Sequence, residues 1–302
     1  MELKFIEIFY RVVEERGFSN AANALFLTQP TISSHIKTLE DEVGLQLLDR
    51  LGRDVVPTKA GEVLYKYAKE IINLKTGALQ AISEFKGTIK GKLMIGGSTI
   101  PGEYILPEYI AKFKNSHPEI TVSLKIGDTQ KITDMVSDGS VEIAVVGAKP
   151  DNERFDCRQF LEDKIVLAAS QKHFKHIKKE IDINEFKKLP LVIREKGSGT
   201  QRSVEGYLKR QGVNPDELNI AAEVSSTEGL KQSVKTGMGA AFLSRFAIKE
   251  VVPCKTLREI TVKGLEIPRH FYIITNKARV LSPICQSFIK TLWNPPDKLK
   301  IL

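Results

Sequence analysis

The stretch from Phe18 to Val43 constrains this chain most, because it reads as two short helices joined by a tight turn. Ala21 and Ala22 are small residues in the first helix, so a second helix can approach it closely. Pro30 is tolerated in the first turn of a helix and indicates where the second helix begins. Apolar residues recur along the second helix at steps of four, three and four, which predicts one buried stripe. These residues are Ile32, Ile36, Leu39 and Val43.

The N-terminal half of this second helix carries short hydrogen-bonding side chains away from the apolar stripe. Glutamine can pair with adenine in the major groove, serine and threonine can serve bases or phosphates, and lysine suits a phosphate. An ordinary helical hairpin with a polar face has the same pattern, so the motif alone leaves both interpretations open. The candidate DNA-contacting residues are Gln29, Pro30, Thr31, Ser33, Ser34 and Lys37.

The flanking segments favour DNA binding. A preceding helix offers a broad apolar face that can cover the pair, formed by Leu3, Phe5, Ile6, Ile8, Phe9, Val12 and Val13. After the pair, two short extended segments around Gly52 predict a small wing. Arg50 and Arg53 lie at or near its tip, where guanidinium groups can reach the backbone or the minor groove of DNA.

With these segments, the N-terminal region resembles the winged helix-turn-helix of the LysR-type bacterial transcriptional regulators. The match is carried by residues 18–44 and 47–61 and continues over essentially the whole chain. The resemblance implies a DNA-binding domain over 1–58, a linker helix over 59–90 that pairs two subunits, and an effector-binding domain over 91–302. That last domain is expected to contain two α/β subdomains similar to periplasmic binding proteins. Subdomain I would comprise 91–162 and 268–302, and subdomain II 163–267.

The linker itself has a regular pattern. Apolar residues recur at steps of three or four over about 28 residues, which predicts one long amphipathic helix or a coiled-coil seam. Such a helix needs a partner for its stripe, either a second subunit or the next domain of the same chain. Gly87 and Gly91 are expected to end the helix and form a hinge. The stripe is Ala60, Leu64, Tyr67, Ile71, Leu74, Ala78, Ile82 and Phe85.

Beyond Lys92, short strands alternate with helices, which predicts an α/β domain with a mostly parallel sheet. A helix is also expected from Ser282 to Trp293. In the resembled fold, the chain crosses between the subdomains near 162–165 and returns near 264–268. The predicted strands cover 93–96, 120–126, 142–146, 164–169, 191–194, 221–225, 240–243 and 269–275.

Four of the strand-to-helix turns carry hydroxyls or glycines where an α/β sheet binds ligands. Helix N-termini at such turns favour an anion, although Ser and Thr also cap helices with no ligand present. The resemblance adds that the four turns converge on one cleft. The candidate effector-binding residues are Ser98, Thr99, Thr129, Arg194, Ser198, Gly199, Thr200 and Ser226.

Within the family, residues 97–99 and 102–107 look similar to members concerned with sulfur or selenium assimilation and with carbon fixation. An oxyanion or small carboxylate is therefore the expected effector. Arg194 could add positive charge to the site or simply pair with a carboxylate.

Composition bounds these hypotheses without proving them. The net charge is +8, yet residues 1–60 hold seven Lys/Arg against nine Asp/Glu, a net of −2, so charge alone does not indicate DNA binding. The N-terminus has no apolar run of membrane length and no secretory signal, which predicts a soluble, cytoplasmic protein. Cys157, Cys254 and Cys285 are isolated, so we expect buried structural thiols and neither a metal nor a disulfide.

Catalytic motifs are missing from the sequence: we find no nucleophile elbow, phosphate loop or two-histidine metal spacing. We therefore expect no enzymatic activity and no cofactor. Two classes of function remain. The first is a homodimeric or tetrameric transcriptional regulator, whose partners would be an operator in double-stranded DNA, a small anionic effector and RNA polymerase. The alternative is a solute-binding module of a transport or sensing system.

Overall fold

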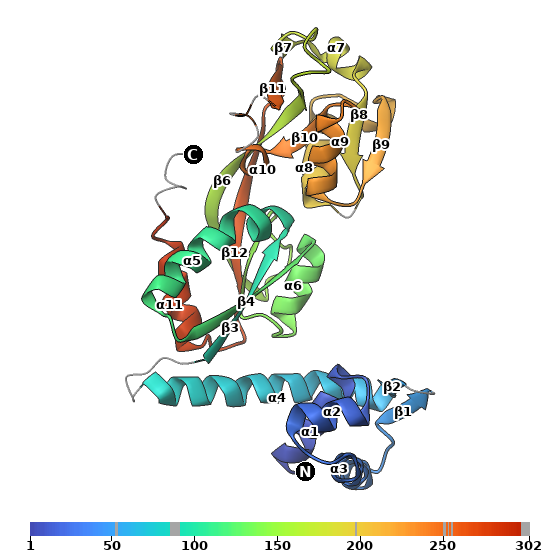
Figure 1. The fold of residues 1–302 in the computed structure, drawn as a ribbon, viewed down its shortest axis with the longest axis vertical. Helices are drawn as coiled ribbons and strands as arrows, with labels where there is room; N and C mark the ends of the chain where they lie inside the picture. Colours follow the sequence, from blue (N-terminus) through green and yellow to red (C-terminus); the bar gives the residue numbers. More distant parts are fainter. Residues whose placement is uncertain are drawn as a thin grey trace. The chain divides into compact units, whose positions relative to one another are not determined.

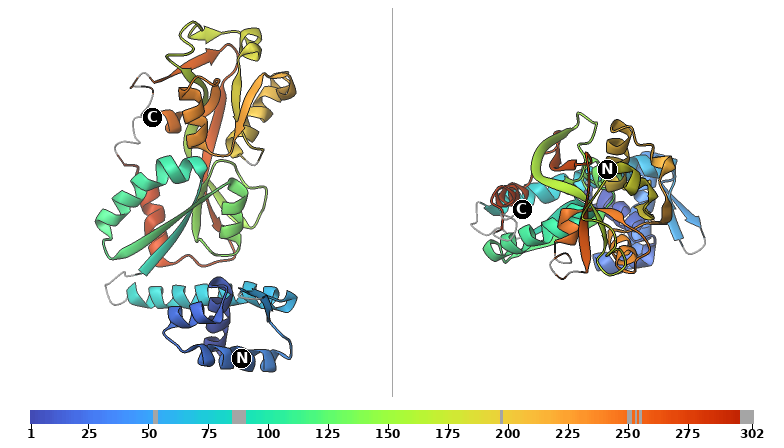
Figure 2. Two further views of the ribbon diagram at one scale, coloured as in Figure 1. Left: turned by 45° about the vertical axis from the view of Figure 1, so that its right-hand side comes forward. Right: turned by 90° about the horizontal axis from the view of Figure 1, so that it is seen from above.

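The computed structural model describes residues 1–51, 54–84, 91–196, 198–249, 252, 254 and 256–296. The chain separates into two compact units, Met1–Thr88 and Ile89–Leu302. The first unit is helical with one small hairpin, and the second combines helices with a mixed sheet (Figures 1 and 2).

The first unit contains three short helices, a two-stranded antiparallel hairpin and a long helix. In chain order these elements are α1 (Leu3–Glu14), α2 (Phe18–Leu25), α3 (Gln29–Val43), β1 (Leu48–Leu51), β2 (Asp54–Pro57) and α4 (Lys59–Glu84). The three short helices pack around one apolar cluster, in which Phe9, Ala21 and Ile32 are fully buried. The helix-turn-helix and the wing hairpin predicted from the sequence are confirmed.

The apolar stripe of α3 is shorter than predicted. Ile32, Ile36 and Leu39 are buried against α1 and α2, as expected. Val43 is exposed, because it is the last residue of α3 and the chain turns away at Gly44, which adopts a positive φ of 73°. Leu3, in the first turn of α1, is exposed as well.

The long helix α4 has two apolar faces rather than the single seam expected from the sequence. Leu64, Ala68 and Ile71 pack on the cluster of the short helices. Tyr67 is exposed and the Leu74 side chain is 72% exposed, because both lie on another side of the helix. Part of the predicted apolar stripe of α4 therefore packs on the chain's own core, and the rest is exposed to solvent. Residues 85 and 87 of the prediction lie outside the described residues.

The second unit begins with strand β3 and ends with helix α11. Its elements are β3 (Gly91–Ser98), a π-helix (Pro101–Ile105), α5 (Leu106–Ser116), β4 (Ile120–Gly127), α6 (Thr129–Ser137), β5 (Ile143–Val146), β6 (Phe155–Ser170), β7 (Glu180–Ile181), α7 (Ile183–Lys188), β8 (Leu191–Arg194), α8 (Gly199–Arg210), a 3₁₀ turn (Pro215–Glu217), β9 (Ile220–Val224), α9 (Thr227–Lys235), β10 (Ala241–Ser244), α10 (Arg245–Ile248), β11 (Leu257–Val262), β12 (Ile267–Asn276) and α11 (Pro283–Leu292).

Two long antiparallel strands, β6 and β12, connect the two lobes of this unit (Figure 1). The main sheet has the order β4-β3-β5-β12-β6-β11-β7, and β10 also pairs with β6. Strands β3, β4 and β5 are parallel to one another, whereas β12 runs antiparallel to both β5 and β6. The pairing of β6 with β12 is interrupted by one register shift between Phe271 and Tyr272.

The sheet is thus mixed and not mostly parallel, which corrects the prediction. The crossover strands are the reason, because a chain that passes to the other lobe and returns along the same path must run antiparallel to itself. The sequence pattern located only the C-terminal part of β6 and missed β7, β11 and α10. The α/β class and the two-lobed arrangement of the second unit are confirmed.

In each lobe, helices cover both faces of the strands. Leu93 and Ile95 of β3 belong to the cluster that contains α5 and α11, and the intervening Met94 packs with the cluster of α6. In the other lobe, Leu191 packs with the cluster of α8 and Val192 with that of α9. This alternation is the period of a strand buried on both faces. The loops that join strands to helices therefore meet at the edges of these layers.

The cysteines differ from the expectation of three buried thiols. Cys285 is buried in the α5 and α11 cluster, and burial raises the pKa of its thiol well above the ordinary value. Cys157 is half-buried and packs against the α6 cluster, and Cys254 is exposed. Among the described residues, no helix is long and apolar enough to span a membrane.

Candidate DNA-binding face and effector cleft

The N-terminus of α3 is fixed by a side-chain cap. The Thr28 hydroxyl accepts a hydrogen bond from the Thr31 N–H at 3.4 Å, and the two hydroxyls lie 2.8 Å apart. Pro30 occupies the first turn, where its missing N–H leaves no donor unpaired. The helix therefore begins at a defined residue, which holds the side chains that follow at fixed positions.

The structure places the candidate DNA-contacting residues of α3 together on one side of the helix. Gln29, Pro30, Ser34 and Lys37 are exposed, and Thr31 and Ser33 are half-buried. The opposite side of α3 is covered by α1 and α2.

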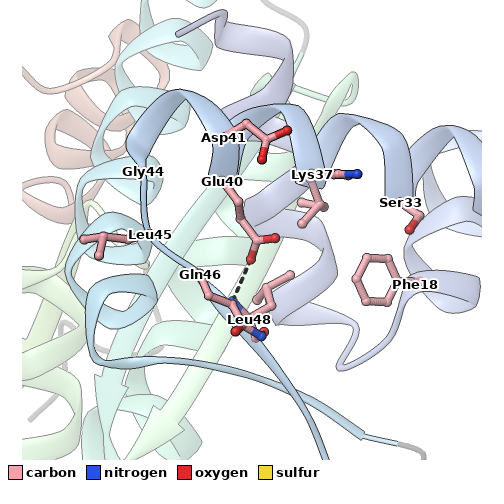
Figure 3. A pocket seen from close by; sticks show the side chains of 10 residues that line it. Phe18, Ser33, Lys37, Glu40, Asp41, Gly44, Leu45, Gln46 and Leu48 are labelled. Carbon is pink, nitrogen blue, oxygen red and sulfur yellow. Dashed lines mark hydrogen bonds between the residues drawn. The ribbon is translucent and has the colours of Figure 1, made fainter.

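A groove of about 670 Å³ runs beside this face and is lined by Ser33, Lys37 and Asp41 of α3, with Phe18 of α2 at one end (Figure 3). It is bounded on the other side by the segment that leads from α3 into the wing.

One carboxylate connects α3 to the start of the wing. Glu40 accepts hydrogen bonds from the N–H groups of Leu47 at 2.8 Å and Leu48 at 3.2 Å. Figure 3 shows the bond with Leu48. Gly61, in the first turn of α4, lies against the same segment, and a Cβ there would come within 2.0 Å of the Leu47 carbonyl oxygen. Sequence reasoning missed both residues. Glu40 stands outside any local motif, since its partners follow seven and eight positions later.

The wing arginines are placed only in part. Arg50 lies on β1 and pairs in register with Val55 of β2, so its backbone position belongs to the hairpin. Arg53 lies outside the described residues. The hairpin is joined to the helices by a hydrogen bond from the Val55 N–H to the Arg16 carbonyl oxygen.

In the second unit, seven of the eight candidate effector residues line one cleft between the lobes. It also contains Arg269 and Phe271 of β12 and Asp128, the N-cap of α6. The N-termini of α6 and α8 approach each other closely, since a Cβ on Gly199 would lie 3.2 Å from the Thr129 hydroxyl oxygen. The seven residues are Ser98, Thr99, Thr129, Arg194, Ser198, Gly199 and Thr200.

Most hydroxyls of the cleft already take part in internal hydrogen bonds. Ser98 accepts from the Gly147 N–H at 3.0 Å, and Thr200 accepts from Arg269 Nη1 at 2.9 Å. Ser198 caps α8 by accepting from the Gln201 N–H at 3.3 Å. The cavity volume in this conformation is about 20 Å³, which is room for about one water molecule. The cleft is therefore closed.

Arg194 is neutralised rather than available as a free cation. Its guanidinium forms two hydrogen bonds of 2.8 Å with the Glu195 carboxylate and one of 2.7 Å with the Thr227 hydroxyl. It also donates to the Ser225 carbonyl oxygen. Of the two roles left open by the sequence, the structure shows carboxylate pairing. The adjacent Glu195 was the signal for it.

Ser226 does not line the cleft, which corrects its inclusion among the effector residues. Its hydroxyl accepts a hydrogen bond from the Gly229 N–H at 3.0 Å and caps α9. The N-terminus of α9 instead reaches the cleft region through Thr227, the partner of Arg194. The simple capping alternative is the one observed at this turn.

Arg269 is the cleft residue that sequence reasoning missed, because it lies within a strand and not at a turn. Its guanidinium pairs with the Asp163 carboxylate, and both side chains are buried. The Ser244 hydroxyl donates to the other Asp163 oxygen at 3.0 Å. Since Asp163 and Arg269 are register partners on β6 and β12, the pair lies where the chain crosses between the lobes.

A second polar contact joins the lobes beside the cleft. Lys231 of α9 lies 3.4 Å from the Tyr104 hydroxyl of the π-helix and 2.9 Å from the Glu228 carboxylate. Burial lowers the pKa of Lys231, but the hydrogen bonds with Glu228 and Tyr104 outweigh it and the pKa stays above its ordinary value. Lys231 is therefore cationic, and its charge is partly balanced by Glu228.

Comparison with known proteins agrees with this geometry. Residues 3–62 match the model "Bacterial regulatory helix-turn-helix protein, lysR family", and residues 86–294 match "LysR substrate binding domain". The chain is 31% identical to the HTH-type transcriptional activator CmpR of Synechocystis sp. over 98% of this chain and 96% of that protein.

Two solved structures extend the comparison. Full-length CbnR in complex with its target DNA is similar with a TM-score of 0.72 and 20% identity, covering 97% of this chain and 99% of that one. The CcmR regulatory domain of Synechocystis PCC6803 in complex with 2-PG has a TM-score of 0.62 and 26% identity, covering 68% of this chain and 97% of that one.

Proposed function

This chain belongs to the LysR family of bacterial helix-turn-helix regulators and is a DNA-binding transcriptional regulator; we propose that α3 reads its operator with the side chains of its N-terminal half. The main support for this proposal is that the N-terminal half of α3 presents a polar, exposed face, whereas its opposite face is buried. Gln29, Ser33 and Ser34 would contact base edges, and Lys37 a phosphate. The wing arginines Arg50 and Arg53 would reach the adjacent backbone or minor groove.

The test for this part is selection of duplex DNA from a random pool by the full-length protein, followed by titration of the selected duplex. We expect one recurring site that binds at least 1,000-fold more tightly than unrelated DNA at the same salt concentration. Equal affinity for both would contradict sequence reading by α3. The solute-binding alternative has no use for this unit, so a selected site would also argue against it.

We further propose that two copies pair through the open face of α4. Val63, Tyr67 and Leu74 are exposed at i, i+4 and i+11, which places them in one row on the helix. A second copy would bury this row and present two recognition helices to two half-sites. The boundaries 1–58, 59–90 and 91–302 remain our proposed domain division.

Leu74→Asp tests the pairing, because a carboxylate in the shared row would be desolvated without a partner. We expect the dimer to weaken by about 2–4 kcal/mol, measured by sedimentation at micromolar concentration. Thr76→Asp is the matched control, since Thr76 is also exposed but lies on a different side of α4. A Leu74→Asp protein that stays dimeric would place the contact elsewhere.

The effector is proposed to bind in the cleft between the lobes, with subdomain I as 91–162 and 268–302 and subdomain II as 163–267. The N-termini of α6 and α8 favour a small anion there, and Arg269, whose charge is balanced by Asp163, contributes the N–H donor that now bonds Thr200. The CcmR regulatory domain, which is similar to this unit, was solved in complex with 2-PG, and this supports a small-molecule effector for the unit. Because the cleft is closed, binding must exchange internal hydrogen bonds for ligand bonds, so Arg269 would turn from Thr200 to the anion.

Binding of the effector would then favour one arrangement of the lobes over another, which is how a ligand shifts a two-state equilibrium. We test this by titrating the protein with 2-PG, inorganic sulfate and inorganic phosphate while following operator affinity. The cleft is proposed to bind the effector and not to convert it chemically. RNA polymerase is the proposed protein partner of the DNA-bound regulator. A bacterial regulator must be in the same compartment as the DNA that it binds, which supports a cytoplasmic location for this protein.

A further inference from the structure

Phe26, in the turn between α2 and α3, combines two unfavourable features in one residue. Its side chain is 94% exposed to solvent. Its backbone has φ 55° and ψ 38°, the left-handed region that a bulky side chain rarely adopts. The N–H groups of Phe26 and Leu27 both donate to the Ala22 carbonyl oxygen, which closes α2 in an arrangement where glycine is the usual residue. The chain thus bears strain and exposes a ring at one position.

The neighbours of Phe26 hold its ring outward. Leu25 and Leu27 are half-buried and pack against the apolar cluster of the first unit. The Thr28 cap fixes the chain on the following side. The ring is therefore presented on a rigid turn, which reduces the entropy lost when a partner covers it. An observed backbone outlier of this kind points toward function.

The position of the turn indicates the partner. In a helix-turn-helix, the second helix lies in the major groove with its N-terminal residues at the base edges, while the first helix crosses the DNA backbone. The turn between them accordingly meets the edge of the groove. Phe26 precedes Gln29 by three residues, and Thr28 and Gln29 are exposed as Phe26 is. An uncharged ring there suits apolar parts of DNA, either the thymine methyl group or the deoxyribose.

We propose that Phe26 is an additional DNA-contacting residue, whose ring packs against a thymine methyl group or a sugar at the edge of the groove that α3 enters. The inference rests on the proposed role of α3 in operator binding. In the free protein, the backbone strain and the exposed ring of Phe26 are unfavourable. In the complex, contact between the ring and DNA would compensate for them. Removing the ring should consequently stabilise the free protein and weaken the complex, two effects of opposite sign.

The experiment compares full-length wild type with Phe26→Gly on a duplex selected from a random pool by the wild type. We expect the unfolding temperature of the variant to rise by a few degrees, because glycine adopts positive φ without strain. We expect operator affinity to fall by about 10-fold or more. The salt dependence of binding should stay unchanged, because no charge is removed. Phe26→Asn, which also tolerates this backbone, should show the same loss of affinity.

Deoxyuridine in place of thymine separates the two DNA groups. If wild type loses affinity on the substituted duplex and Phe26→Gly does not, the ring contacts a thymine methyl group. If the substitution has no effect while Phe26→Gly still binds weakly, the ring contacts a sugar. Leu3→Ala is the control, since Leu3 is exposed in the same unit but far from the turn in the sequence; it should leave operator affinity unchanged.

Unchanged operator affinity of Phe26→Gly would overturn the proposal. If binding were unchanged but transcription in a purified system with RNA polymerase were lost, the ring would belong to a protein contact instead, which also overturns it. Failure of the role proposed for α3 is distinguishable, because Ser34→Glu would then bind the operator as tightly as wild type.

Discussion

The recognition face of α3 and the cleft between the lobes are built from the same kinds of residue, yet their hydrogen bonds differ. Among the described residues, the side chains of Gln29, Ser34 and Lys37 form no hydrogen bond or ion pair with the rest of the protein. In the cleft, Ser98 and Thr200 are both engaged by internal donors. The first region is a surface ready for a rigid partner, whereas the second is a locked site in which a ligand must replace existing bonds.

The largest expected effect is a loss of stability when the buried Arg269 side chain, which lines the cleft, is replaced. Arg269→Met leaves the buried Asp163 carboxylate without its cation, which should lower the free energy of unfolding by about 3–5 kcal/mol. Denaturant unfolding measures the loss. Arg158→Met is the matched control, because both side chains of the Arg158 pair with Asp156 are exposed and the pair should be worth at most about 1 kcal/mol. Equal effects of the two variants would mean that the Asp163 pair does not lock the site.

A substitution on the recognition face of α3 should change operator affinity and not the stability of the protein. Ser34→Glu adds a carboxylate where we expect phosphates and bases, and like charges held close together cost several kcal/mol, so operator affinity should fall by about 100-fold or more. The unfolding temperature should barely change, since the Ser34 side chain is exposed. Gln171→Glu introduces the same charge on the second unit as a control. A gel-shift titration in which both variants bind like wild type would contradict the recognition face.

The smallest effects should separate two neighbours within the cleft. The Thr99 hydroxyl donates only a long bond of 3.4 Å to the Gly127 carbonyl oxygen, whereas buried Ser98 accepts at 3.0 Å from Gly147. Thr99→Val should therefore cost about 1–3 kcal/mol of effector affinity and little stability.

Ser98→Ala should instead lower stability, because the buried Gly147 N–H loses its acceptor. Paired thermal unfolding and calorimetric titration with 2-PG check both variants. The cleft assignment fails if Thr99→Val changes the unfolding temperature but not binding.

Elements whose determinants are local could be predicted from the sequence. The apolar period of α3, its Thr28 cap and Pro30 all lie within one short stretch, and the helix begins where they indicate. Strand β6 could be predicted only in part, because its N-terminal half has alternating polar residues and pairs with β12 more than 100 positions away. Pairing over such separations leaves no local pattern.

The candidate sites divide in the same way. Turn residues such as Ser198 and Thr200 were found because strand-to-helix turns are visible in the sequence. Arg269 was missed because its role depends on the register of two distant strands, which also placed Asp163 beside it. Whether a hydroxyl caps a helix or faces a cleft also depends on packing, as Ser226 shows.

The two lobes of the second unit share strands instead of being joined by loops alone. Strands β6 and β12 run from one lobe into the other (Figure 2). They form one hydrogen-bonded pair with a single register shift, between Phe271 and Tyr272. A paired ribbon resists stretching and sliding, because either motion breaks its hydrogen bonds, but it can change its twist at little cost. An effector that opens or closes the cleft would accordingly twist this pair of strands. The resulting change would be a rotation of one lobe relative to the other, which is measured as an angle.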